Sequence, residues 1–175
     1  MQSHPLSLVV LVLMVVSTTT GPSAAEGPPK LDYALDDQFG TTHADEDCGE
    51  AVVVLLGGDR KGSAYIDEWG SALRQAYSRE LEEGRVCSVG FAHLKGAPFF
   101  VKKKIVASFP KDPEAWVLLD WKGEISKNWG AEKDAANFYV FDRGGGLVFR
   151  VSLQDFDQAT FDEIVRIVRE TAAER

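Results

Sequence analysis

The stretch AVVVLL at residues 51–56, closed by the glycine pair at 57–58, decides the fold of this chain. A continuous run of apolar, largely β-branched residues predicts a strand buried on both faces, as strands inside parallel sheets are. Apolar residues then recur at helical spacing over residues 64–82, which predicts an amphipathic helix directly after this strand. The chain therefore begins its core with a strand–helix unit.

Further elements follow this unit in alternation. We expect a strand at 86–94, a helix at 98–107, a strand at 116–121, a short helix at 124–129, two strands at 138–141 and 147–151 joined by a DRGGG hairpin turn at 142–146, and a last helix with Thr160 and Glu163 as its capping box. A short hairpin is expected at 31–45. Because a helix joins the first two long strands, they should be parallel neighbours. The result is a mixed central sheet with helices on both faces.

The first residues carry the pattern of an export signal. Residues 6–16 (LSLVVLVLMVV) are apolar apart from Ser7 and would rise about 16 Å as a helix, roughly half of a bilayer core. Small and polar residues follow, so we expect a signal peptide over 1–25 that is cleaved after Ala25. Residues 26–30 are then a linker and 31–175 the folded domain. An uncleaved anchor is the alternative, because no Lys or Arg precedes the apolar run, although we expect no stable membrane anchor.

Composition excludes several function classes. The 175 residues carry 19 basic and 27 acidic side chains, a net charge of −8, which disfavours nucleic acid as a partner. Two cysteines are too few for a four-cysteine zinc site. The sequence predicts no metal and no cofactor. Residues 43–48 (HADEDC) contain ligand-type side chains, but nothing in their spacing orders them into a coordination shell, and a solvated acidic loop is the simpler interpretation.

Three stretches resemble a known family. They are LDDQFGTTH (35–43) followed by GEAVVVLLGGD (49–59), LLDWKGEISKNWG (118–130), and NFYVFDRGGGLVFRV (137–151). In this order they resemble the peroxiredoxin-like superfamily of alkyl hydroperoxide reductases and thiol-specific antioxidant proteins, over residues 31–173. The signal segment and GGDRKGS (57–63) suggest its secreted, YtfJ-like branch. The resemblance implies a thioredoxin-like, three-layer α/β/α fold with a mixed central sheet and a short N-terminal hairpin.

The resemblance also places a redox motif at the start of the helix after the first core strand. There this chain reads Asp59, Arg60, Lys61, Gly62 and Ser63, without a cysteine. Ser63 lies near the peroxidatic position, and a serine hydroxyl is not ionised at neutral pH and cannot form a sulfenic acid. The family's cis-proline is also missing at 135–138. We therefore expect an exported protein that has lost the redox motif and has a non-catalytic binding or structural role, with no assigned catalytic residue.

The same loop is the candidate ligand site. It would stand at the edge of the sheet where open α/β folds bind ligands. Arg60 and Lys61, with the helix amides, are placed to receive a small anionic ligand or a carboxylate of an unknown protein partner. Replacing both by alanine should then abolish binding. The alternative is a helix start whose former chemistry is gone.

The two cysteines permit a different interpretation. Cys48 lies three residues before the first core strand, and Cys87 is the second residue of the next. If those strands are parallel neighbours, both sulfurs lie near the same edge and a disulfide is within reach. A structural disulfide, two unlinked thiols and a functional redox pair all remain open. The last would make the chain an exported thiol–disulfide oxidoreductase or a peroxiredoxin-like antioxidant that uses Cys48 and Cys87.

Two further features complete the candidates. Lys102, Lys103 and Lys104 form a solvated helix face or contact an acidic partner. His93 lies near the end of its strand and is either structural or a base, with no nucleophile evident beside it in the sequence.

Overall fold

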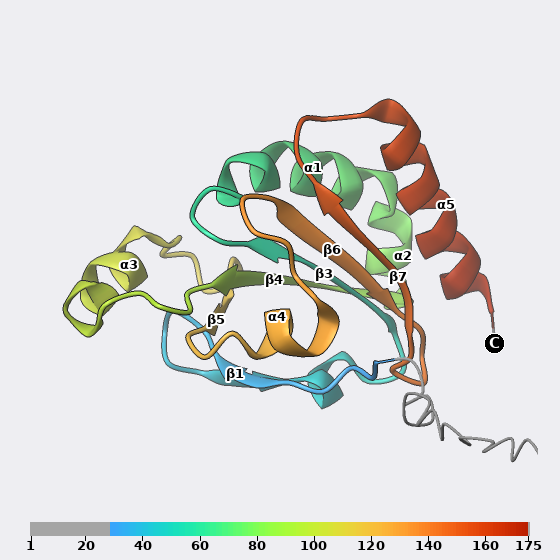
Figure 1. Cartoon of the computed structure of the whole chain (residues 1–175). Coiled ribbons are helices and arrows are strands. Elements are labelled where there is room, and N and C mark those ends of the chain that lie inside the picture. The colour runs from blue at the N-terminus through green and yellow to red at the C-terminus, as the bar shows by residue number, and fades with distance from the viewer. Residues whose placement is uncertain (1–28, 175) are drawn as a thin grey trace, which may run out of the picture.

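The central element is a five-stranded mixed sheet in a computed structural model that describes residues 29–174 (Figure 1). From one edge to the other its strands are β5 (Leu118–Asp120), β4 (Val86–His93), β3 (Val52–Gly58), β6 (Ala136–Phe141) and β7 (Leu147–Leu153). β3 pairs in parallel with β4, and β4 with β5, while β6 runs antiparallel to both β3 and β7. The predicted parallel pair and the mixed sheet are confirmed.

Helices and a hairpin cover the two faces of this sheet (Figure 1). One face carries α1 (Ser63–Ala76), α2 (Ser78–Glu82) and α5 (Gln158–Ala173). The other carries α4 (Glu124–Trp129) and the hairpin of β1 (Ala34–Asp36) and β2 (Thr42–Ala44), which leads into the short 3₁₀ turn η1 (Asp45–Cys48). The expected three layers and N-terminal hairpin are therefore present.

Two hydrophobic clusters hold the layers together. Trp69 and Leu73 of α1 pack with Phe138 of β6 on one face. Trp129 of α4 packs edge-on against Phe141 of β6 on the other face, at 5.0 Å between ring centroids. Residues of β3 contribute to both clusters, and all but Leu56 are buried, because a strand at the centre of the sheet is covered on both sides. The double burial predicted for this strand is confirmed.

Two local expectations were wrong. The helix expected at 64–82 breaks at Tyr77, whose φ of −112° and ψ of 28° are not helical. The Tyr77 side chain is buried in the cluster on that face, at the point where the helix is interrupted. The last helix is capped by Asp157 and not by Thr160, because the Asp157 carboxylate accepts the Thr160 backbone N–H at 2.8 Å.

The segment between β4 and β5 leaves the body of the molecule. The 3₁₀ turn η2 (Phe99–Val101) and α3 (Lys102–Ser108) stand away from the end of the sheet (Figure 1). The expected helix at 98–107 thus begins as a 3₁₀ turn. Between residues 29 and 174, no helix has both the length and the apolar character needed to cross a membrane. The predicted signal peptide and its cleavage after Ala25 lie outside the described residues.

Candidate functional site

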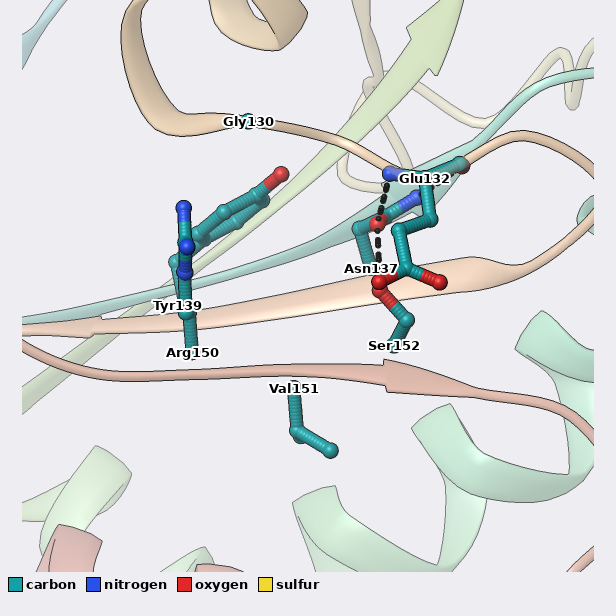
Figure 2. A pocket seen from close by; sticks show the side chains of 7 residues that line it. All are labelled: Gly130, Glu132, Asn137, Tyr139, Arg150, Val151 and Ser152. Carbon is teal, nitrogen blue, oxygen red and sulfur yellow. Dashed lines mark hydrogen bonds between the residues drawn. The ribbon is translucent and has the colours of Figure 1, made fainter.

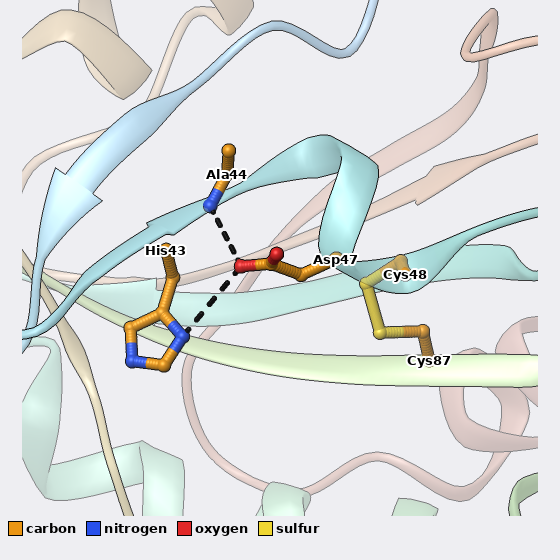
Figure 3. The surroundings of a disulfide bond; sticks show 5 residues. All are labelled: His43, Ala44, Asp47, Cys48 and Cys87. Atoms are coloured by element: carbon orange, nitrogen blue, oxygen red, sulfur yellow. Dashed lines mark hydrogen bonds and ion pairs between the residues drawn. A yellow bond between two sulfur atoms is a disulfide. The ribbon is translucent and has the colours of Figure 1, made fainter.

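Cys48 and Cys87 are joined by a disulfide (Figure 3). Cys48 ends η1 and Cys87 lies in β4 opposite Val53 of β3, so the bond ties the hairpin layer to the sheet. The Cα atoms are 5.7 Å apart and the cysteines are separated by 39 residues in sequence. Both residues are half-buried and pack against the hydrophobic cluster on the hairpin side of the sheet. Parallel pairing of the two strands brings the sulfurs together as the sequence predicts.

A histidine and two carboxylates stand beside this disulfide. His43 Nε2 lies 3.0 Å from Asp37 Oδ2, and its Nδ1 lies 3.8 Å from Asp47 Oδ2 (Figure 3 shows the second contact). Its ring stacks on Trp116 with the centroids 4.0 Å apart. Burial raises the pKa of Asp37, but the hydrogen bonds from His43 and two backbone amides outweigh it, so that pKa lies below its usual range. The histidine is thus fixed in position by its neighbours.

The residues between His43 and the disulfide are acidic. Asp45, Glu46 and Asp47 form the first turn of η1, and Asp47 Oδ2 accepts the Ala44 backbone N–H at 3.0 Å. In the part of the chain that the structure describes, no group of three or more His, Cys, Asp or Glu side chains is placed to hold a metal ion. These carboxylates instead give the surface beside Cys48 a negative charge.

The loop at Asp59–Ser63 lies at the other end of β3, roughly 23 Å away at the rise of an extended strand. The Asp59 Oδ1 atom accepts the backbone N–H groups of Lys61 and Gly62, at 3.0 and 2.9 Å. Burial raises the pKa of Asp59, but three backbone hydrogen bonds outweigh it and hold that pKa below its usual range. A bound anion would therefore have to displace the Asp59 carboxylate from two of the amides expected to receive it.

The side chains of Lys61 and Ser63 in this loop are also engaged. Lys61 Nζ pairs with Asp134 Oδ2 at 2.7 Å, and the Ser63 hydroxyl donates to the Arg60 carbonyl at 2.8 Å. A Cβ atom on Gly62 would collide with the Ala135 carbonyl oxygen, so glycine permits close packing of the loop on the segment before β6. The ligand site at Asp59–Ser63 stays a prediction.

His93 has partners that the sequence did not reveal. Its Nδ1 atom lies 2.6 Å from Ser126 Oγ and 3.6 Å from Asp120 Oδ2. The Asp120 carboxylate is fully buried and accepts the backbone N–H groups that open α4. In a catalytic triad the serine and the acid bond to opposite ring nitrogens, whereas here both face Nδ1. These contacts therefore join β4, β5 and α4, and they lack the geometry of an acyl-transfer site.

A small polar cavity lies beside the β6–β7 pair (Figure 2). Its volume is about 110 Å³. It is lined by Gly130, Glu132, Asn137, Tyr139, Arg150, Val151 and Ser152. Asn137 Oδ1 accepts from the Glu132 N–H and the Ser152 hydroxyl, at 2.7 and 3.0 Å, and Arg150 donates to the Trp129 carbonyl. The volume suits a few water molecules, at about 30 Å³ each, and no sequence pattern predicted this cavity.

Comparison with known proteins finds similarity of fold. No protein-family model matches the sequence, and no curated protein matches it. Among solved structures, a candidate thiol:disulfide interchange protein DsbE from Chlorobium tepidum is 18% identical, with a TM-score of 0.62 over 86% of this chain and 100% of that one. The exposed lipoprotein thioredoxin Etrx1 of Streptococcus pneumoniae is 15% identical, with a TM-score of 0.60 over 79% and 98% of the two chains.

A third similar structure is a secreted disulfide oxidoreductase of Mycobacterium tuberculosis. It is 16% identical to this chain, with a TM-score of 0.54 over 80% of this chain and 96% of that one. At these identities the likeness establishes the fold alone. The chain has the thioredoxin-like α/β fold predicted from its sequence.

One sequence interpretation is contradicted. We expected a chain that had lost its redox cysteines and had a non-catalytic role, because the loop at Asp59–Ser63 holds none. The structure instead joins Cys48 and Cys87 in a disulfide, so the chain does hold a linked cysteine pair. The main expectation rested on the edge where β3 ends, whereas the pair, which the sequence had left open as an alternative, lies where β3 and β4 begin.

Proposed function

We propose that this chain is an exported thiol–disulfide oxidoreductase whose redox pair is Cys48 and Cys87. The observation that carries the proposal is their disulfide, half-buried at one edge of a thioredoxin-like sheet. Support comes also from the similar structures, which include a disulfide oxidoreductase and a thioredoxin. The chain would use the reaction class of those proteins from a different position on the fold.

The reaction is a two-electron exchange. A thiolate of a dithiol substrate attacks one sulfur of the Cys48–Cys87 bond and forms a mixed disulfide, releasing the other cysteine as a thiolate. The second thiolate of the substrate then attacks the mixed disulfide, so the substrate leaves oxidised. Two electrons and two protons pass from the substrate to the two cysteines. The reverse sequence would reduce a substrate disulfide.

Charge near the bond selects among substrates. Three carboxylates of η1 directly precede Cys48, and the whole chain carries a net charge of −8. An anionic thiol such as glutathione is repelled by this surface, whereas a neutral or basic dithiol protein is not. We therefore expect reaction with glutathione to be slow at low ionic strength and faster when salt screens the carboxylates.

Export and family branch belong to the same proposal. The apolar run at 6–16 and the small residues before Ala25 support a cleaved signal peptide and a periplasmic or extracellular location. A disulfide fits such a compartment. The motifs at 35–43, 118–130 and 137–151 support a place in the peroxiredoxin-like superfamily, in its secreted, YtfJ-like branch.

A thiol count tests the redox role. Exported, purified protein is unfolded, alkylated and weighed by mass spectrometry, before and after equilibration in a glutathione buffer at about −200 mV. We expect no alkylation before and two labels per chain after. The same mass reports whether the chain begins at Glu26. Protein that stays unlabelled after equilibration would hold a purely structural bond, and the redox proposal would be wrong.

A single-turnover assay tests the exchange itself. Oxidised protein is mixed with a reduced, unfolded dithiol protein, and we expect one substrate disulfide formed for each Cys48–Cys87 bond opened. The variant C48S/C87S should form none. Ser63→Ala, at the position where the family resemblance places its reactive cysteine, should match the parent because Ser63 takes no part in the exchange. Activity that survives C48S/C87S would refute the assignment.

A further inference from the structure

A basic arm, residues 94–111 between β4 and β5, exposes two aromatic rings. Phe99 is 84% exposed and Phe100 is 73% exposed, and the rings meet edge to face with centroids 5.9 Å apart. The arm stands clear of the sheet and its covering helices (Figure 1). Large apolar side chains that lie together and are exposed indicate a site of contact with a membrane or with another apolar surface.

The charge of the basic arm is opposite to that of the rest of the chain. It contains Lys95, Lys102, Lys103, Lys104 and Lys111, and no Asp or Glu, in a chain whose net charge is −8. Among the described residues 29–174, none of these lysines forms an ion pair. Lys102 lies over the Trp121 ring, with its Nζ 4.7 Å from the centroid. The lysine charges are thus free to meet an external anion.

Hydrogen bonds fix the base of the basic arm, whereas most of the rest of the arm is exposed to solvent. Gln38, in the turn between β1 and β2, donates from Nε2 to the Pro110 and Ala115 carbonyls, at 3.3 and 3.0 Å. Its Oε1 accepts the Val117 backbone N–H at 2.8 Å. No residue of η2 or α3 is fully buried. The two phenylalanines and the three consecutive lysines are therefore held out from a supported base.

We propose that the basic arm docks this protein reversibly on an anionic lipid surface. Phe99 and Phe100 insert at the boundary between headgroups and acyl chains, and the lysines contact lipid phosphates. This combination of apolar and basic side chains is the one that binds anionic membrane interfaces. The rings form a projecting tip, which suits a deformable interface better than the pocket of a folded partner. Insertion of only two rings gives a reversible contact, and the proposal does not depend on the redox function.

Sedimentation with vesicles tests this proposal. Purified protein, in a single form verified by mass, is mixed with vesicles of phosphatidylcholine alone or of phosphatidylcholine with phosphatidylglycerol. We expect binding to the anionic vesicles, weakening with salt, and little binding to the zwitterionic ones. F99S/F100S should weaken binding by about tenfold for each ring lost. K103E/K104E should weaken it on the order of twentyfold or more, since each surface cation contributes about fivefold.

Matched controls separate the basic arm from general charge and apolarity. Phe39→Ser removes an exposed phenylalanine outside the basic arm. K127E/K133E makes the same charge change as K103E/K104E, from −8 to −12, at exposed positions elsewhere. Both controls should bind like the parent, and circular dichroism checks that every variant is folded. Any apolar segment before residue 29 is common to all variants, so it cannot produce the differences.

Three results would overturn the proposal. One is equal binding by the arm variants and their controls, and another is absence of binding to anionic vesicles. The third is tight, salt-sensitive binding to an acidic polypeptide such as polyaspartate together with no vesicle binding, which would assign the arm to an acidic protein partner.

Discussion

Opening the Cys48–Cys87 bond should lower the stability of the fold by an amount set by the loop it closes. The cysteines are separated by 39 residues, and the chain-entropy relation for a loop of that size gives a loss of about 13 cal/mol/K in the entropy of the unfolded chain. At 25 °C this corresponds to about 4 kcal/mol. We therefore expect C48A/C87A to unfold with a free energy lower by about 4 kcal/mol than that of the oxidised parent.

Two independent measurements check this value. Urea unfolding followed by tryptophan fluorescence gives the free energy of unfolding for the oxidised parent and for C48A/C87A. Titration in thiol buffers gives the reduction potentials of the folded protein and of the protein in denaturant. Thermodynamic linkage requires the two results to agree, so a stabilisation of about 4 kcal/mol places the folded potential about 85 mV below the unfolded one.

The reasoning would be refuted by either of two results. If C48A/C87A unfolds at the same urea concentration as the parent with the same slope, the bond does not stabilise the fold through the loop it closes. If the two potentials are equal while the unfolding energies differ, the alanines have damaged packing around η1 and β4 instead. Alkylated, reduced parent distinguishes these cases, because it lacks the bond and keeps both cysteine Cβ atoms.

The remaining predictions concern pH, packing and capping. Burial raises the pKa of both Tyr33 and Tyr77 to about 12, so between pH 10 and 12 these phenols ionise only in the unfolded chain. The free energy of unfolding should therefore fall by about 1.4 kcal/mol per pH unit for each tyrosine. Y77F should remove the contribution of Tyr77 to this fall, as measured in alkaline urea titrations. Gly62→Ala would force a Cβ into the Ala135 carbonyl and should lower stability by about 1–3 kcal/mol in thermal unfolding, whereas Gly84→Ala meets open space and costs only its strained backbone, at φ +66°. Asp157→Ala removes the cap of α5 and should cost about 1 kcal/mol, and Asp157→Asn should recover most of this loss; equal melting temperatures for all three proteins would exclude a capping role.

The fold was predictable from the sequence because its strands and helices have distinct periods. The apolar run at 51–56 and the helical spacing after it require a buried strand and a covering helix, and the right-handed crossover then makes β3 and β4 parallel neighbours. The same pairing made the Cys48–Cys87 disulfide foreseeable. The break at Tyr77 was not foreseeable, since a continuous helical pattern does not reveal that one buried ring needs a non-helical backbone.

The candidate site was predictable only in part. A search for cysteines at the family's usual position found Ser63 and gave too much weight to that loop, although the linked pair of Cys48 and Cys87 lies elsewhere. The role of Asp59 as acceptor for its own loop depends on amide directions that sequence spacing does not give. Asp120 meets His93 because β5 pairs with β4 in that register, and Ser126 meets it because α4 folds back over the ends of the two strands. Side-chain contacts that depend on how a loop or a helix lies against the sheet were the part that the sequence could not supply.

The Gln38 side chain gives the sheet a property that none of its own strands supplies. β5 is an edge strand, and edge strands attract pairing by other chains through their free backbone groups. Beside β5, Gln38 bonds the Val117 N–H and the Ala115 carbonyl, as a neighbouring strand would. One side-chain amide thus occupies backbone groups directly before β5 and hinders pairing by another chain at this end of the edge. Loss of the Gln38 side chain should therefore appear first as association between molecules that increases with protein concentration, and only later as a change in the isolated molecule.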